Sequence, residues 1–187
     1  MRNYLGTAGV DKHFQLMNDI DLSGSIPEAS QGWEPIGNNP DDSDAFTGFL
    51  HGSNFTIKNL WINRASSNFI GLFGYVENGG IDHLTIELDV TKGINGGENV
   101  GIFAGVIDGG AITDCQAKGK ITATGYIGGL VGSVRENVTV ENNTATVTII
   151  SSDGYVGGLI GQTTSPITNC TSFGAVSYTH LRAHETL

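Results

Sequence analysis

A six-residue motif recurs four times along the chain, and this recurrence constrains the fold more than any other feature. Each copy is an apolar stretch closed by a glycine, and the closing glycines are separated by 31, 27 and 29 residues. The copies are Phe69–Gly74, Val100–Gly105, Ile127–Gly132 and Val156–Gly161. A constant motif at such a period is typical of an architecture in which each unit stacks on its neighbours.

Alignment of the four copies places equivalent apolar residues in columns. One column holds Leu72, Phe103, Leu130 and Leu159, and the next holds Phe73, Ala104, Val131 and Ile160. A short β-unit cannot bury its apolar face alone, so such columns stack into a core of parallel strands spaced ~4.8 Å apart. The sequence predicts an all-β parallel β-helix, expected to be right-handed, with coils of 27–31 residues. An antiparallel β-sandwich is the alternative, but it gives no reason for a constant spacing.

A second, four-residue motif follows the first and keeps step with it. Its copies are Ile57–Leu60, Ile81–Leu84, Ile112–Cys115, Val140–Asn143 and Ile167–Cys170. The alignment puts Cys115 and Cys170 in one column with Asn143 between them, so we expect the cysteines two coils, or roughly 9–10 Å, apart. Bridged cysteines have Cα atoms about 4.4–6.8 Å apart, so two buried free thiols are predicted.

The third positions of these motifs form a mostly amide or acidic line. Its members are Asn59, His83, Asp114, Asn142 and Asn169. We interpret the line as an asparagine ladder whose side chains bond to one another and to exposed backbone at turns, and a binding role is the alternative. The glycines are expected to supply the φ > 0 corners that close each coil.

Residues 1–50 carry a different pattern and are interpreted as lead-in coils before repeats over residues 51–175. Three aspartates occur in the polar stretch Asn38–Asp44, but their spacing differs from that of a calcium-binding loop. A solvated loop is therefore favoured there, with calcium binding as the alternative.

The segment 176–187 breaks the repeat, and residues 176–186 resemble a translated sequencing adapter. We expect one solenoid fragment over residues 1–175 and an artefactual tail after it. His184 and Glu185 lie in this tail, and the second histidine of a zinc-binding HExxH motif is missing because the chain ends at Leu187.

Charge and hydropathy exclude several classes of partner. The chain has a formal net charge of -10, and its 9 Lys and Arg residues form no cluster, which argues against nucleic acid. No apolar run approaches the ~20 residues of a membrane-spanning helix. Nothing in the sequence indicates a metal or another cofactor.

The segments Ile127–Gly132 and Val156–Gly161 closely resemble the GLUG motif, named for its Gly-Leu-apolar-Gly core. Phe69–Gly74 keeps this core, whereas Val100–Gly105 departs from it. The resemblance covers about residues 10–175 and implies a bacterial exported protein. The family includes adhesin-like surface proteins and the non-catalytic N-terminal region of zinc peptidases that cleave immunoglobulin A. It implies an extracellular or cell-surface location.

Three functions follow as hypotheses. The first is a non-catalytic spacer or adhesion module whose partner is a host glycan or a host surface protein. The alternative is that the chain is an accessory region of an immunoglobulin A-cleaving zinc peptidase. A polysaccharide-degrading enzyme is the third, although Asp82 aligns with Thr113 and Asp114 aligns with His83, so carboxylates do not adjoin within a column. No catalytic residue is assigned. Tyr126 and Tyr155 share a column and are candidates for stacking on a sugar.

Overall fold

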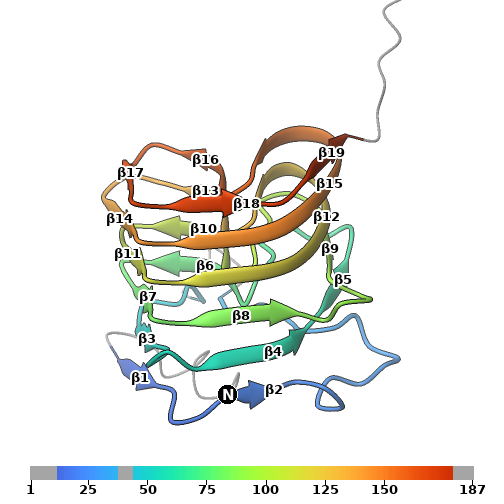
Figure 1. Ribbon diagram of the computed structural model, residues 1–187, viewed down its shortest axis with the longest axis horizontal. Helices are drawn as coiled ribbons and strands as arrows, with labels where there is room; N and C mark the ends of the chain where they lie inside the picture. Colours follow the sequence, from blue (N-terminus) through green and yellow to red (C-terminus); the bar gives the residue numbers. More distant parts are fainter. Residues whose placement is uncertain (1–11, 38–43, 179–187) are drawn as a thin grey trace, which may run out of the picture.

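The computed structural model describes residues 12–37 and 44–178, and within these ranges every strand belongs to a coil of one solenoid. The coils rise from the N-terminal end, blue at the bottom of Figure 1, to the C-terminal end, red at the top. They make about 4 turns, and the strands of neighbouring coils pair in parallel. The predicted all-β parallel β-helix is confirmed, while its right-handed winding stays a prediction.

Two of the sheets are simple ladders with one strand from each coil that reaches them. Among the described residues the first sheet has six strands: β1 (His13–Gln15), β3 (Phe49–His51), β7 (Gly80–Asp82), β11 (Gly110–Thr113), β14 (Val138–Glu141) and β17 (Ile167–Thr168). The second has four strands: β6 (Phe73–Glu77), β10 (Ala104–Asp108), β13 (Val131–Val134) and β16 (Ile160–Thr163).

The third sheet is wider because each coil crosses it with a longer or divided strand. Its main path is β2 (Ile20–Asp21), β4 (Thr56–Leu60), β8 (Thr85–Leu88), β12 (Gln116–Gly128), β15 (Thr144–Gly157) and β18 (Thr171–Phe173). Three further strands pair at its side: β5 (Ile62–Arg64), β9 (Ile94–Gly96) and β19 (Val176–Tyr178). The long β12 therefore pairs with both β8 and β9 of the preceding coil.

The strand register confirms the apolar columns and the period. Phe73 pairs with Ala104, Ala104 with Val131 and Val131 with Ile160 across the second sheet. In the neighbouring column, Leu72, Phe103 and Leu130 are completely buried, whereas Leu159 of the last coil is only partly buried. The stacked apolar residues thus form one continuous core along the axis.

One copy of the second motif was aligned wrongly. Ile57 pairs with Ile86 in the third sheet, and it is Leu50 that pairs with Ile81 in the first sheet. Asn59 consequently lies at a register shift between Lys58 and Leu60, outside the column of His83 and its successors. The first corner of this coil lies around Ser53 and Asn54, both at positive φ, where the sequence lacks the motif.

The polar line is a line of left-handed backbone corners. His83, Asp114, Asn142 and Asn169 have φ values of 48°, 54°, 57° and 50°, where the chain turns from the first sheet to the third. Asn, Asp and His tolerate this conformation better than most side chains do. Backbone bonds join the column, from the Asp114 N–H to the Glu141 carbonyl at 3.1 Å and from the Asn142 N–H to the Thr168 carbonyl at 3.1 Å. Among the described residues, no hydrogen bond joins the side chains of Asn142 and Asn169, so the predicted asparagine ladder is not formed at these corners.

The closing glycines serve close packing instead of positive-φ corners. Gly105, Gly132 and Gly161 are not among the positive-φ glycines of the described residues. A Cβ on Gly132 would lie 2.5 Å from the Val100 nitrogen, and a Cβ on Gly161 would lie 2.5 Å from the Ile127 nitrogen. Any larger side chain would push two backbone segments apart, so these motif glycines serve packing. The predicted positive-φ glycines lie elsewhere, for example at Gly109 and Gly125. Gly74 lies in β6, and its N–H donates to the Ile36 carbonyl at 2.8 Å.

Both cysteines are free, as their register predicts. Asn143 lies between them: its side-chain oxygen accepts the Cys115 N–H at 2.9 Å, and its own N–H donates to the Cys170 sulfur at 3.3 Å. Cys115 is buried, but Cys170 is partly exposed because its coil is the last one described. The expectation of two buried thiols therefore holds for Cys115 alone.

The described part of the lead-in residues forms the first coil. Ile36 bridges in parallel to Phe73, and the Trp33 indole N–H donates to the Leu72 carbonyl at 3.0 Å. The loop 38–43, with most of its aspartates, lies outside the described residues, as does the tail 179–187. β19 pairs with β15 through Tyr178. The domain boundary at Ala175 and the artefactual tail stay predictions.

Candidate functional site

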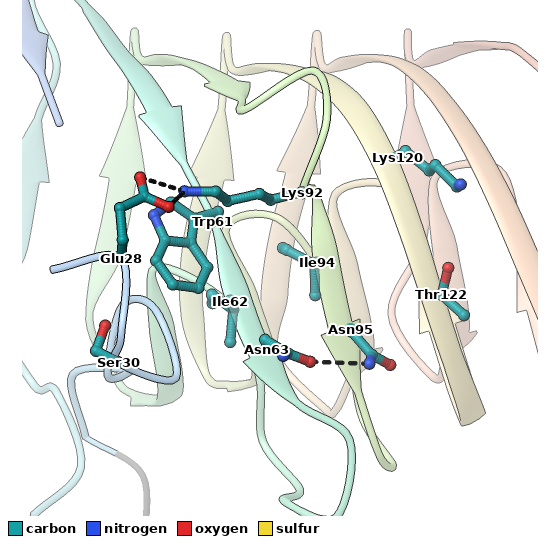
Figure 2. Close-up of a pocket in the computed structure, with 10 residues that line it drawn as sticks. All are labelled: Glu28, Ser30, Trp61, Ile62, Asn63, Lys92, Ile94, Asn95, Lys120 and Thr122. Atoms are coloured by element: carbon teal, nitrogen blue, oxygen red, sulfur yellow. Dashed lines mark hydrogen bonds and ion pairs between the residues drawn. The ribbon is translucent and has the colours of Figure 1, made fainter. Parts of the chain in front are cut away.

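A groove of about 450 Å³ lies on the outer face of the third sheet, beside the strands β5, β9 and β12 (Figure 2). It is lined by Glu28, Ser30, Trp61, Ile62, Asn63, Lys92, Ile94, Asn95, Lys120 and Thr122. The isoleucines belong to the buried row of the coil, and polar side chains from four successive coils surround them. The groove is therefore a direct product of stacking.

One wall of the groove is a closed electrostatic cluster around Trp61. The Lys92 ammonium lies 4.4 Å from the centre of the indole ring and 2.6 and 2.7 Å from the two carboxylate oxygens of Glu28 (Figure 2). Trp61 is only 6% exposed beneath this pair. The charges of Glu28 and Lys92 offset each other, so this wall is locally neutral.

The strand side of the groove carries a row of amide and hydroxyl groups. Asn95 donates from its side-chain nitrogen to the Asn63 side-chain oxygen at 3.0 Å, and Asn95 pairs in register with Thr122. An amide has donors and an acceptor, so this shared bond leaves each asparagine further hydrogen-bonding capacity. Such a row suits a ligand that offers several hydroxyl groups in sequence.

Lys120 supplies a positive charge at the edge of this row. On the same sheet Lys58 pairs with Asp19 at 2.9 Å and Lys118 pairs with Glu87 at 2.9 Å. Among the described residues, no carboxylate lies within ion-pair distance of the Lys120 ammonium. Lys120 also lines a second groove of about 440 Å³ with Lys58 and Lys118.

The Asp19 and Lys58 pair is reinforced by backbone contacts. The side-chain hydrogen bond from Lys58, followed by that from the Thr56 N–H, lowers the pKa of the Asp19 carboxyl. The same carboxylate raises the pKa of the Lys58 ammonium. Both groups are therefore charged at neutral pH and hold β4 to the lead-in coil.

Tyr126 and Tyr155 stack as a pair on neighbouring coils. They are partners in the parallel register of β12 and β15, with ring centroids 5.3 Å apart and ring planes 11° from parallel. Tyr155 is 67% exposed. The shared column is confirmed, whereas its role in stacking on a sugar stays a prediction.

Carboxylates do not face each other along the first sheet, as the alignment indicates. Asp82 pairs with Thr113, and Thr113 pairs with Glu141. The Asp114 carboxylate lies 4.0 Å from His83. Across residues 12–37 and 44–178, no group of three or more His, Cys, Asp or Glu side chains is arranged to hold a metal ion. The same ranges contain no helix long and apolar enough to cross a membrane.

Residues 152–177 match the family model described as the GLUG motif. This part of the chain therefore contains a GLUG motif. The matched segment contains the end of β15 and the strands β16, β17 and β18, so the family model covers the last coil.

Two relatives share the repeat sequence over a larger part of the chain. Halomucin from Haloquadratum walsbyi is 35% identical over 138 residues, which are 72% of this chain and 2% of halomucin. A "putative Gly-rich membrane protein" from Evansella cellulosilytica is 36% identical over 115 residues, which are 57% of this chain and 13% of that protein. The chain thus spans a small fraction of the length of both relatives.

A solved structure confirms the architecture independently. The crystal structure of a "putative immunoglobulin A1 protease" from Bacteroides ovatus superimposes with a TM-score of 0.65 at 18% identity. The match covers 94% of this chain and 63% of that chain. At this identity the likeness establishes the fold.

Sequence reasoning found the tyrosine pair but missed the groove. The tyrosines follow the repeat motif, so one alignment brings them together. The groove joins residues from positions 28 to 122, and two of its walls come from segments outside the motif. The spacing of Asn63 and Asn95 was the available signal, because 32 residues separate them, close to one coil.

Proposed function

We propose that this chain is a non-catalytic module of a cell-surface or secreted protein, in which a rigid stack presents rows of polar side chains. The observation that supports this role most directly is the alternation in the third sheet. The outward row runs Thr56, Thr85, Gln116, Thr144 and Thr171 in register, and the adjacent inward row runs Ile57, Ile86, Ala117 and Ala145. All four members of the inward row are at most 1% exposed.

Because of this alternation, the residues that stabilise the stack are different from the residues that form its surface. Inward residues supply the hydrophobic core, and each outward position can change while the core stays intact. Its rows repeat at every coil, about 4.8 Å apart. A surface of this kind suits contact with an extended, repeating partner, and the kinship with halomucin and a Gly-rich membrane protein is in keeping with an extracellular or cell-surface setting.

The groove supports a more specific proposal, that the module binds a glycan and so acts in adhesion. Asn63, Asn95 and Thr122 offer amide and hydroxyl groups to sugar hydroxyls, and Lys120 offers a cation to an acidic sugar. The exposed Tyr155 ring is a second place where a sugar face can stack. The groove and the tyrosine pair are separate candidate subsites.

The test is a glycan and host-protein binding screen with the full chain. We expect binding to a carbohydrate, reduced at least about tenfold by the double change Asn63→Ala and Asn95→Ala, because each lost hydrogen bond is worth about 0.5–1.5 kcal/mol. The double change Thr85→Ala and Thr144→Ala, on the outward row away from the groove, is the matched control. Loss of binding in the control alone would place the binding site on the outward threonine row instead of the groove. If the chain binds no glycan or host protein, adhesion is excluded and only the spacer role remains.

Catalytic and accessory roles make different predictions for the same preparation. A polysaccharide-degrading enzyme would turn over members of a polysaccharide panel and lose that activity on Asp114→Asn. Service to an immunoglobulin A-cleaving peptidase, suggested by the fold shared with the Bacteroides ovatus protein, would require the module to bind immunoglobulin A. We expect no turnover on the panel, and measurable turnover would overturn the proposed role.

A further inference from the structure

Two histidines from different coils face each other at the N-terminal end of the first sheet. His13 lies in β1 and His51 in β3, and the His13 Nδ1 atom is 2.8 Å from the His51 Nε2 atom. The ring planes are 10° from parallel and the centroids are 5.2 Å apart. Nearly parallel rings at this centroid distance, with nitrogens this close, meet edge to edge, so an N–H of one ring donates to the nitrogen of the other.

A carboxylate holds the His51 ring in place, and the exposed His13 ring packs on a phenyl ring. His51 contacts the Asp82 carboxylate through its Nδ1 atom at 2.6 Å, and Asp82 lies on the next strand, β7. His13 lies over the Phe49 ring, with centroids 4.7 Å apart and planes 8° from parallel. A carboxylate on one ring nitrogen fixes the tautomer of a histidine and makes its other nitrogen a better metal ligand.

The two nitrogens are close enough to bind one ion together once the hydrogen bond between them is broken and one ring turns. Ligand bonds of about 2.0 Å at a right angle place two nitrogens about 2.8 Å apart, so only a small adjustment is needed. Tetragonal nitrogen and oxygen coordination is typical of Cu²⁺ and Ni²⁺, and Cu²⁺ binds such ligands more tightly.

We propose that His13 and His51 form a two-histidine site for a divalent transition-metal ion, with Cu²⁺ preferred, and that Asp82 positions His51 for it. Binding replaces the proton shared by the two rings, and a rotation of the exposed His13 ring aims its lone pair at the ion. Water completes the coordination, since the His51 side chain is 36% exposed and His13 is exposed. The ion then fastens β1 to β3, the outermost pair of the first sheet.

The test is a Cu²⁺ titration of the full chain, followed by electron paramagnetic resonance and calorimetry. His180 and His184, which lie beyond the described residues, are replaced by Gln in every sample so that they cannot bind copper. We expect one tight equivalent of Cu²⁺ with hyperfine splitting from two imidazole nitrogens. His13→Gln and His51→Gln should each reduce the affinity at least tenfold, and Asp82→Asn should reduce it by about 10- to 100-fold.

His83→Gln is the matched control, because His83 is 50% exposed and contacts the other oxygen of Asp82 at 3.1 Å. It should leave the affinity within about twofold. Circular dichroism of each variant checks that the strands remain. Protection of β1 from hydrogen exchange should rise on adding Cu²⁺ to the parent and not to His13→Gln. Absence of tight copper binding, or full affinity in His13→Gln, would overturn the proposal.

Discussion

The central coils and the last described coil contain the same motif in very different surroundings. Val100, Ile102 and Phe103 of a central coil are 0% exposed. In the last coil, Ile167 is 43% exposed and Val176 is 44% exposed. Their partners in the preceding coil, Val140 and Ile149, are buried. A central coil is covered by neighbours on both sides, whereas the last described coil is covered on one.

The difference indicates that burial in this molecule comes from the neighbouring coil and not from the motif itself. In repeat proteins, stability is approximately a sum of the intrinsic stability of each unit and of the interfaces between units. A residue in a central coil contributes to two interfaces, and its equivalent in the last coil contributes to one. Equivalent substitutions should therefore have unequal effects.

The largest effect is expected in the leucine column. Leu130→Ala removes a completely buried side chain between two coils and should lower the free energy of unfolding by about 2–5 kcal/mol. Leu159→Ala removes the equivalent, partly buried leucine and should cost clearly less. Urea denaturation of the two variants compares them directly. Equal losses would contradict the nearest-neighbour account.

The next effect concerns two adjacent asparagines. Asn143 is 0% exposed, and its side chain bonds to the Cys115 N–H and the Ile112 carbonyl, both at 2.9 Å. Asn143→Ala leaves two buried backbone groups without these partners, which should cost about 1–3 kcal/mol for each group left unsatisfied.

Asn142→Ala is the matched control, because Asn142 is exposed and occupies a corner at φ 57°. Its loss should be about 1–2 kcal/mol, the cost of placing alanine in a left-handed conformation. Chemical denaturation measures both variants. A smaller loss for Asn143→Ala than for Asn142→Ala would show that the buried amide has no structural role.

A smaller effect, with a pH dependence, comes from a cluster that ties three central coils together. The Tyr75 hydroxyl donates to Asp108 at 2.8 Å and accepts from Arg135 at 2.9 Å. Burial, and then the hydrogen bond to Asp108, raises the pKa of Tyr75 to about 12. In the unfolded chain the tyrosine hydroxyl ionises at about pH 10. The stability that Tyr75 contributes to the folded state is therefore complete below pH 10 and is lost as the pH rises to about 12.

Tyr75→Phe should therefore lower the free energy of unfolding by about 1 kcal/mol at pH 7 and reduce the fall in stability between pH 10 and 12. Denaturation curves at pH 7, 10 and 11 measure this. An unchanged pH dependence in Tyr75→Phe would assign the alkaline loss of stability to other groups.

The smallest effect distinguishes the two thiols. Burial raises the pKa of the Cys115 thiol, so little thiolate forms there, whereas Cys170 lies partly exposed on the last coil. A thiol reagent should modify Cys170 in the native protein and reach Cys115 only after unfolding. Mass spectrometry of the labelled peptides measures the extent of modification at each cysteine. Equal labelling of both cysteines in the native protein would contradict the register of the last coils.

The coils could be predicted from the sequence because residues in equivalent positions share an environment. Leu72, Phe103 and Leu130 fill one column, and one alignment finds them all. The error at Ile57 arose where the Leu50 segment lacks the motif that marks the later corners. The sequence also led us to expect glycine at the left-handed corners, although asparagine, aspartate and histidine occupy the corners between the first and third sheets.

The candidate sites were harder to predict because their members come from outside the motif. Glu28 and Lys92 meet over Trp61 only because two irregular segments pack against the side of the stack. His13 and His51 are 38 residues apart, a separation that does not match the 27- to 31-residue period of the repeats. Contacts across the irregular first coil depend on the length of its loops, which the repeat does not determine.

Native-state hydrogen exchange tests the central claim most directly, because it measures the stability of each coil in one experiment. Backbone amides of β10, β11 and the first half of β12 should exchange slowest. Protection should fall through β15 and be low in β17, β18 and β19, which are among the strands covered on one side. Uniform protection along the stack, or slowest exchange in the last coil, would contradict the account of a solenoid stabilised by its neighbouring coils.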